Sequence, residues 1–110
     1  MNCSYDALYF GDDGYIVRCK SCGHFQLAYA SIMLTLNAGD FEVLRHIVAT
    51  RAQEALPQPF EPACKTVVIQ TPATGVFILL TPAETRRFAI ILEEADTEAK
   101  ALSLLGLFAE

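Results

Sequence analysis

Runs of apolar and β-forming residues in the first third of the chain predict antiparallel strands. Residues 7–10 and 15–18 are rich in aromatic and aliphatic side chains, and they flank the Gly/Asp loop of residues 11–14. This pattern predicts a β-hairpin. Residues 24–36 (HFQLAYASIMLTL) are also rich in β-formers but long for one strand, so we expect a bend near Ala30 and Ser31. Together the three runs predict a three-stranded meander.

Helical spacing appears next, in residues 41–55, where apolar positions recur every three or four residues. Asn37 can cap this helix, and Asp40 favours its positive end. Two prolines, at positions 57 and 59, end it, because proline lacks an amide donor and restricts the residue before it.

A second hairpin and a second helix are predicted in the rest of the chain. Residues 66–70 and 76–80 are β-forming runs on either side of a turn sequence. Residues 81–84 (TPAE) then supply a capping hydroxyl, a proline at the first helical position and the glutamate of a capping box. The apolar stripe of the following helix runs from Phe88 to Leu102, and a break or kink is conceivable at residues 96–97.

This order of elements predicts an α+β fold, with an antiparallel sheet of about five strands and two helices on one face. A faint repeat with an offset of 44 residues aligns residues 32–48 with residues 76–92, and Asn37 with Thr81. The repeat suggests a strand-strand-helix duplication, although any two capped amphipathic helices after strands would look alike. The 110 residues are expected to form a single domain, residues 1–110.

Composition narrows the class of function. The net charge of -5 argues against general binding of nucleic acid or of an anionic membrane, both of which need a basic surface. No segment approaches the roughly 18 apolar residues of a membrane span, and residues 1–10 lack the features of a secretory signal. We therefore expect a cytoplasmic protein, whose cysteines are thiols or metal ligands rather than disulfides.

The segment of residues 19–24 (CKSCGH) carries the strongest chemical signal. Two cysteines two residues apart, followed by glycine at a hairpin tip, are typical of half a zinc site. If Phe10 pairs with Tyr15 and the hairpin continues without interruption, Ala7 lies opposite Arg18, and Asp6 opposite Cys19. The same register brings Cys3 close to Cys22.

The predicted metal ligands are therefore Cys3, Cys19, Cys22 and His24, holding zinc. The fourth of these, His24, lies on the strand that leaves the turn and could reach back to the metal. Cys64 or a water molecule could take its place.

Two other interpretations of the cysteines remain open, plain reduced thiols and redox chemistry. A thioredoxin-type CxxC sits at a helix N-terminus, whereas here Gly23 and a strand follow, which makes redox chemistry the weaker interpretation. Hydrolysis through Cys22 and His24 would lack an oriented third group and an oxyanion motif. The sequence thus favours a protein that is not an enzyme. His46 lies off the apolar stripe of its helix and is expected to face solvent.

The C-terminal run of residues 101–108 (ALSLLGLF) is apolar on more than one face. One apolar face of this helix can pack on the protein's own sheet, and the apolar residues on the other faces require a partner that shields them from water. A symmetric homodimer through this helix is the commonest solution.

Residues 14–19 (GYIVRC) and 22–29 (CGHFQLAY) resemble a family of small uncharacterised bacterial proteins, found mainly in Bacteroidota. That family combines an early cysteine, a CxxC knuckle, a strand of the FQLAF kind and a helix. The resemblance covers the first half of the chain and implies a fold but no activity. The segment is more distantly similar to single zinc-ribbon knuckles, although the second CxxC of a ribbon is missing.

These observations lead to the hypothesis of a non-enzymatic binding or regulatory module with a structural zinc knuckle. One alternative is a metal-free dimerising domain whose cysteines are plain thiols. The other is a thiol-dependent enzyme or redox sensor that uses Cys19 or Cys22.

Overall fold

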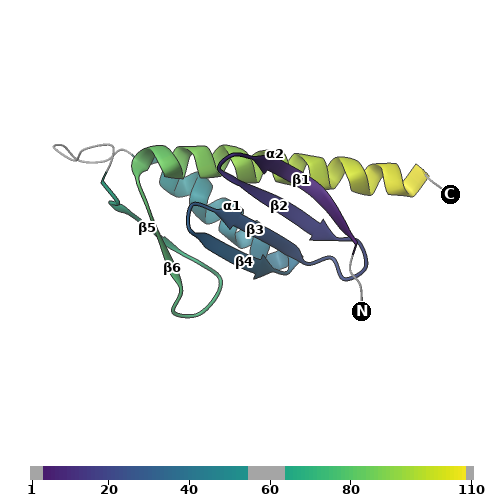
Figure 1. Cartoon of the computed structure of the whole chain (residues 1–110), viewed down its shortest axis with the longest axis horizontal. Helices are drawn as coiled ribbons and strands as arrows, with labels where there is room; N and C mark the ends of the chain where they lie inside the picture. Colours follow the sequence, from purple (N-terminus) through teal and green to yellow (C-terminus); the bar gives the residue numbers. More distant parts are fainter. Residues whose placement is uncertain (1–3, 55–63, 109–110) are drawn as a thin grey trace. The chain divides into compact units, whose positions relative to one another are not determined.

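The computed structural model describes residues 4–54 and 64–108 (Figure 1). The chain divides into two compact units, the first made of residues 1–38 and 91–110 and the second of residues 39–90. Within the described residues the fold contains six strands in two antiparallel sheets, and two helices. The α+β prediction is confirmed, whereas the single domain of residues 1–110 stays a prediction.

The first unit contains a four-stranded meander with the order β1-β2-β3-β4. Its strands are β1 (Tyr5–Gly11), β2 (Gly14–Cys19), β3 (Phe25–Tyr29) and β4 (Ile32–Leu36). The meander has one strand more than predicted, because the expected bend at Ala30 and Ser31 is a complete reversal that pairs Tyr29 with Ile32. Ala30 takes a φ of 54°, the positive value that a tight hairpin turn needs at its first central residue.

A bulge at Leu8 corrects the predicted register of the first hairpin. Phe10 pairs with Tyr15 as expected, but the register shifts between Ala7 and Tyr9. Leu8 is the extra residue, and its side chain is buried. The predicted pairs of Ala7 with Arg18 and of Asp6 with Cys19 are therefore wrong by one residue. The observed partners are Ala7 with Val17, Asp6 with Arg18 and Tyr5 with Cys19.

One face of the meander is apolar and buried. Ile16 of β2 lies opposite Leu27 of β3, and both are almost inaccessible to solvent. The first unit also contains α2 (Pro82–Phe108) from Ile91 onward, where Ala95 and Ala99 are buried. A hydrogen bond of 3.5 Å from Arg18 Nη1 to the Ala99 carbonyl joins β2 to α2.

The second unit contains a separate two-stranded hairpin, β5 (Val67–Gln70) and β6 (Phe77–Leu80), together with α1 (Ala38–Gln53) from Gly39 onward and the start of α2. Burial alternates along both strands, as expected for a sheet with one covered face. Three apolar residues of α1 are buried at helical spacing: Phe41, Leu44 and Val48.

The capping box at the start of α2 is confirmed. The Glu84 amide donates to Thr81 Oγ1 at 3.0 Å, and the Thr81 amide donates to Glu84 Oε1 at 2.8 Å. The helix then continues without the break that Asp96 and Thr97 could have caused. Asp96 instead forms an ion pair of 2.9 Å with Lys100 one turn later, which supports the helix.

The offset of 44 residues recurs in the positions of the elements. β4 ends at Leu36 and α1 begins at Ala38, while β6 ends at Leu80 and α2 begins at Pro82. The duplication itself stays a prediction. Neither helix, over the residues described, combines the length and apolar character needed to cross a bilayer.

Candidate functional site

The turn between β2 and β3 is closed by its own backbone. The Cys19 amide donates to the His24 carbonyl at 2.9 Å, which extends the antiparallel ladder by one pair. The Gly23 amide donates to the Cys19 carbonyl at 3.0 Å. Gly23 has a φ of 76°, in the left-handed region that favours glycine, so the sequence Cys22-Gly23 suits this turn. The backbone therefore holds Cys19, Cys22 and His24 within one short loop.

The two cysteines of the turn have different surroundings. Cys19 is only 2% exposed, whereas Cys22 is exposed. The Cys22 amide donates a hydrogen bond of 3.4 Å to Cys19 Sγ, and Ser21 Oγ lies 3.3 Å from the same sulfur. An amide that points at a sulfur stabilises negative charge there, and the thiolate is the form that binds a metal ion. The turn is thus suited to hold Cys19 as a metal ligand.

An open pocket with a volume of about 260 Å³ lies beside the turn and belongs to the first unit. Cys19, Cys22 and His24 all line it. Its other lining residues come from the strands of the meander: Tyr5, Phe25, Gln26 and Thr35. The structure therefore brings three of the four predicted ligands to one pocket.

The other predicted ligands have different outcomes. Cys3 lies outside the described residues, and the bulge at Leu8 changes the register from which its approach to Cys22 was predicted. Cys64, the alternative ligand, is exposed and belongs to the second unit. Within residues 4–54 and 64–108 no three His, Cys, Asp or Glu side chains are already grouped as a metal site.

The donor types at the pocket nevertheless fit zinc. Two cysteine sulfurs and one imidazole are among the ligands that zinc prefers, and a tetrahedral site needs one more. Cys19, Cys22 and His24 would hold the ion, which would link the turn to β3. The fourth ligand would come from Cys3 or from water.

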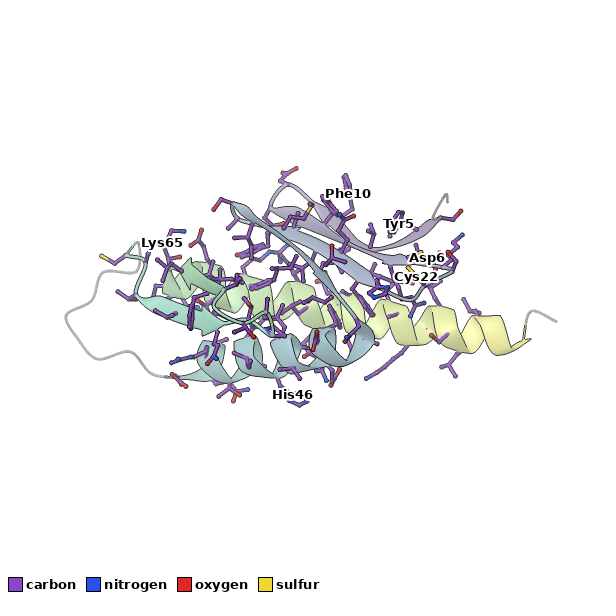
Figure 2. The ribbon with its side chains drawn as sticks, turned by 90° about the horizontal axis from the view of Figure 1, so that it is seen from below. Tyr5, Asp6, Phe10, Cys22, His46 and Lys65 are labelled. Carbon is purple, nitrogen blue, oxygen red and sulfur yellow. The ribbon has the colours of Figure 1, made fainter. Side chains whose placement is uncertain are left out.

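Four lining residues were not predicted from the sequence: Tyr5, Phe25, Gln26 and Thr35. Tyr5 is the cross-strand partner of Cys19, and Gln26 is the partner of Thr35. Their positions follow from strand pairing, so the correct register would have identified them. Figure 2 shows Tyr5 and Cys22 at the same end of the first unit.

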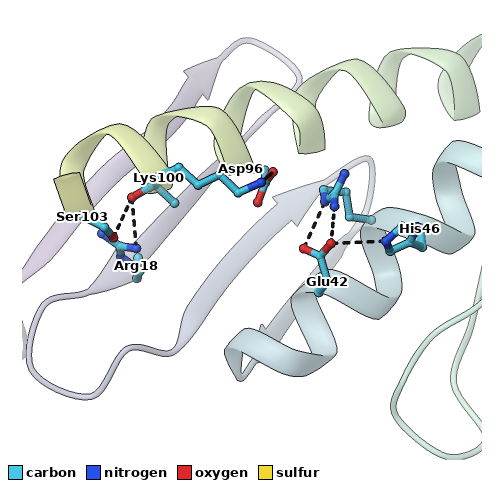
Figure 3. Close-up of polar contacts among 8 residues, drawn as sticks. Arg18, Glu42, His46, Asp96, Lys100 and Ser103 are labelled. Atoms are coloured by element: carbon cyan, nitrogen blue, oxygen red, sulfur yellow. Dashed lines mark hydrogen bonds and ion pairs between the residues drawn. The ribbon is translucent and has the colours of Figure 1, made fainter.

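His46 belongs to α1, in the second unit. Its side chain is exposed, and Nε2 lies 3.3 Å from Glu42 Oε1 (Figure 3). Glu42 also forms an ion pair with Arg45. The 72% exposure of the His46 side chain agrees with the prediction that this residue faces solvent.

Comparisons of the chain with models of known protein families, with curated proteins and with solved structures found no match. The resemblance to the bacterial CxxC family therefore stays a prediction.

Proposed function

We propose that this protein is a non-enzymatic binding or regulatory module with a structural zinc ion at the turn of residues 19–24. Cys19, Cys22 and His24 hold the ion, and Cys3 completes the set. The observation that carries the proposal is that two cysteines and a histidine line one pocket, with the Cys22 amide directed at Cys19 Sγ.

A structural rather than catalytic role rests on the burial of Cys19. Cys19 is only 2% exposed, which gives a substrate little access to its thiol, but the thiol can still bind an ion enclosed by the same turn. Zinc bound by Cys3 would also tie the start of the chain to the turn, and ligands far apart in sequence stabilise the folded state most effectively. We further infer a cytoplasmic location, where the thiols stay reduced.

Metal analysis tests this proposal. The protein is purified without chelator and its zinc is measured by mass spectrometry, with about one ion per chain expected for one tetrahedral site. Cys19→Ser and Cys22→Ser should each abolish stoichiometric zinc. Cys64→Ser is the matched control, because it removes an exposed thiol of the second unit and should retain the ion.

Two further variants separate the remaining ligands. His24→Ala should weaken zinc binding, and Cys3→Ser should weaken it as well if the fourth ligand is Cys3 rather than water. Wild-type protein that contains no zinc, and whose melting temperature does not change with added zinc or chelator, would contradict the proposal. Rapid alkylation of Cys22 by iodoacetamide at neutral pH would instead favour the redox-sensor alternative.

A second proposed function, dimerisation, is supported by the C-terminal part of α2. Leu104 is 58% exposed and Leu105 is 64% exposed, and they are adjacent on the helix. We propose that a second copy of the chain covers them in a symmetric homodimer. Sedimentation velocity tests this role, with Leu104→Glu expected to shift dimer to monomer. Val43→Glu, at an exposed position of α1, is the control and should leave the dimer intact.

A further inference from the structure

A second pocket of the first unit, with a volume of about 390 Å³, lies next to the turn of residues 19–24. Asp6, Arg18 and Lys20 line it together with Phe25. Cys19 and Phe25 line both pockets, so the two share a wall. Their polar groups differ, since the first pocket has thiols and an imidazole and the second has ionised side chains.

Arg18 is the half-buried cation of this second pocket. Its Nη1 donates to the Ala99 carbonyl at the long distance of 3.5 Å, and that carbonyl also accepts a shorter hydrogen bond of 2.9 Å from Ser103 Oγ (Figure 3). A guanidinium group has five N–H donors. Within the described part of the chain, Arg18 forms no ion pair with a carboxylate.

Asp6 is the cross-strand partner of Arg18, but its carboxylate pairs with another residue. Asp6 Oδ1 lies 3.5 Å from Lys20 Nζ. The pocket is therefore lined by two cations and one carboxylate, which leaves an excess of one positive charge. Apart from the hydrogen bond to Ala99, the N–H donors of the Arg18 guanidinium group can bind a ligand in this pocket.

We propose that this pocket binds a small monocarboxylic acid, with its carboxylate on Arg18 and its apolar body beside Phe25. A guanidinium binds a carboxylate through two parallel hydrogen bonds. The positive charge of the pocket attracts an anion, and Phe25 offers an apolar contact that a carboxylic acid with an apolar body can make and inorganic phosphate cannot. The volume lies in the range of roughly 300–1,000 Å³ that is usual for small-molecule sites.

This inference names a ligand for the binding role proposed above, and it rests on that role but not on the zinc ion. The two can be separated with Cys22→Ser, because Cys22 lines the first pocket and is not among the residues that line the second. A Cys22→Ser protein that loses zinc and still binds the acid would show that binding of the acid does not depend on the zinc ion.

The test is a titration of the ¹⁵N-labelled full chain with butyrate, followed by NMR. We expect saturable shifts of the Arg18 Nε–H signal and of the amide of Gly23, which also lines this pocket. Butyramide has nearly the same shape without the charge and should shift neither signal. Inorganic phosphate should bind more weakly than butyrate at neutral pH.

Variants of Arg18 complete the test. Arg18→Gln should weaken butyrate binding at least about tenfold, as expected for the loss of a charge-assisted hydrogen bond. Arg86→Gln, at an exposed position in the second unit, is the matched control and should bind as the native protein does. Arg18→Lys keeps the charge but loses the paired hydrogen bonds, so its affinity should be intermediate.

Three results would overturn the inference. These are equal binding of butyrate and butyramide, unchanged affinity in a folded Arg18→Gln protein, and a preference for phosphate. If neither Arg18 variant folds, the comparison of butyrate with butyramide on the native chain decides the question.

Discussion

Gly14→Ala should be the most damaging small substitution in the first hairpin. Gly14 begins β2 opposite Tyr29 of β3, and it has a φ of 153°. A Cβ atom added there would lie 1.9 Å from the Ala28 carbonyl oxygen and 2.9 Å from the Ala28 carbonyl carbon. Both are backbone atoms, so β2 and β3 would have to separate locally by more than 1 Å to reach the 3.0 Å limit of real contacts.

The expected loss of stability has two parts, a conformational cost at residue 14 and the loss of a hydrogen bond between β2 and β3. A backbone conformation that L-residues avoid costs about 1–3 kcal/mol. A ladder hydrogen bond lost when the strands separate adds about 0.5–1.5 kcal/mol. We therefore expect Gly14→Ala to lower the free energy of unfolding by about 3 kcal/mol.

Gly75→Ala is the matched control. Gly75 also has a positive φ, 79°, but an added Cβ would meet nothing within 4 Å. Only the conformational cost of about 1–2 kcal/mol remains. A larger loss in Gly14→Ala than in Gly75→Ala is therefore expected from the contact with Ala28.

Urea denaturation followed by circular dichroism measures both variants, provided that the slope of the free energy with urea stays unchanged. Each kcal/mol corresponds to a fall of about 4–8 °C in the melting temperature of a chain of this size. A Gly14→Ala protein as stable as Gly75→Ala would contradict the close approach of Gly14 to the Ala28 carbonyl.

Other substitutions test the second helix and the core. Thr81→Ala removes the capping hydroxyl of α2 and should cost about 1 kcal/mol in urea denaturation. The hydrogen bond from Lys65, followed by that of the Thr81 amide, holds the pKa of the Glu84 carboxyl below its ordinary value of 4.5. The stability from ionised Glu84 is therefore present above that value and is lost as the pH falls through the lowered pKa. Lys65→Met should accordingly flatten the fall of the melting temperature with acid, and an unchanged slope would contradict this role. Phe88→Ala should cost about 3–5 kcal/mol because Phe88 is 0% exposed, whereas Phe10→Ala, at 81% exposure, should change the unfolding free energy by no more than about 0.5 kcal/mol.

The elements that were predicted most accurately are those whose ends are marked by a short sequence motif, such as a helix cap or a turn. The start of α2 was readable because Thr81 and Glu84 form a capping box whose spacing alone defines it. The first hairpin was readable from its loop, and Phe10 does pair with Tyr15. By contrast, Ala30 gave no signal of a complete reversal, because alanine rarely takes the positive φ that the turn requires.

The register of β1 could not be predicted for a related reason. Residues 7–10 (ALYF) are apolar throughout, so they lack the alternation that fixes which side chains face the core. Nothing in this run marks Leu8 as the bulged residue. The turn that presents Cys19 and Cys22 was predicted from its own sequence, but the side chains around it depend on β1 and therefore were not.

The bulge at Leu8 determines which side chains of β1 line each of the two pockets. Side chains alternate between the faces of a strand, so a shift of one residue exchanges neighbours between faces. Without the bulge, Asp6 would lie opposite Cys19 and would place a carboxylate beside the thiols of the first pocket. With it, Tyr5 takes that position, and Asp6 instead lies opposite Arg18 and pairs with Lys20. One inserted residue thus places a tyrosine rather than a carboxylate opposite Cys19, and it places Asp6 with Arg18 and Lys20 at the second pocket.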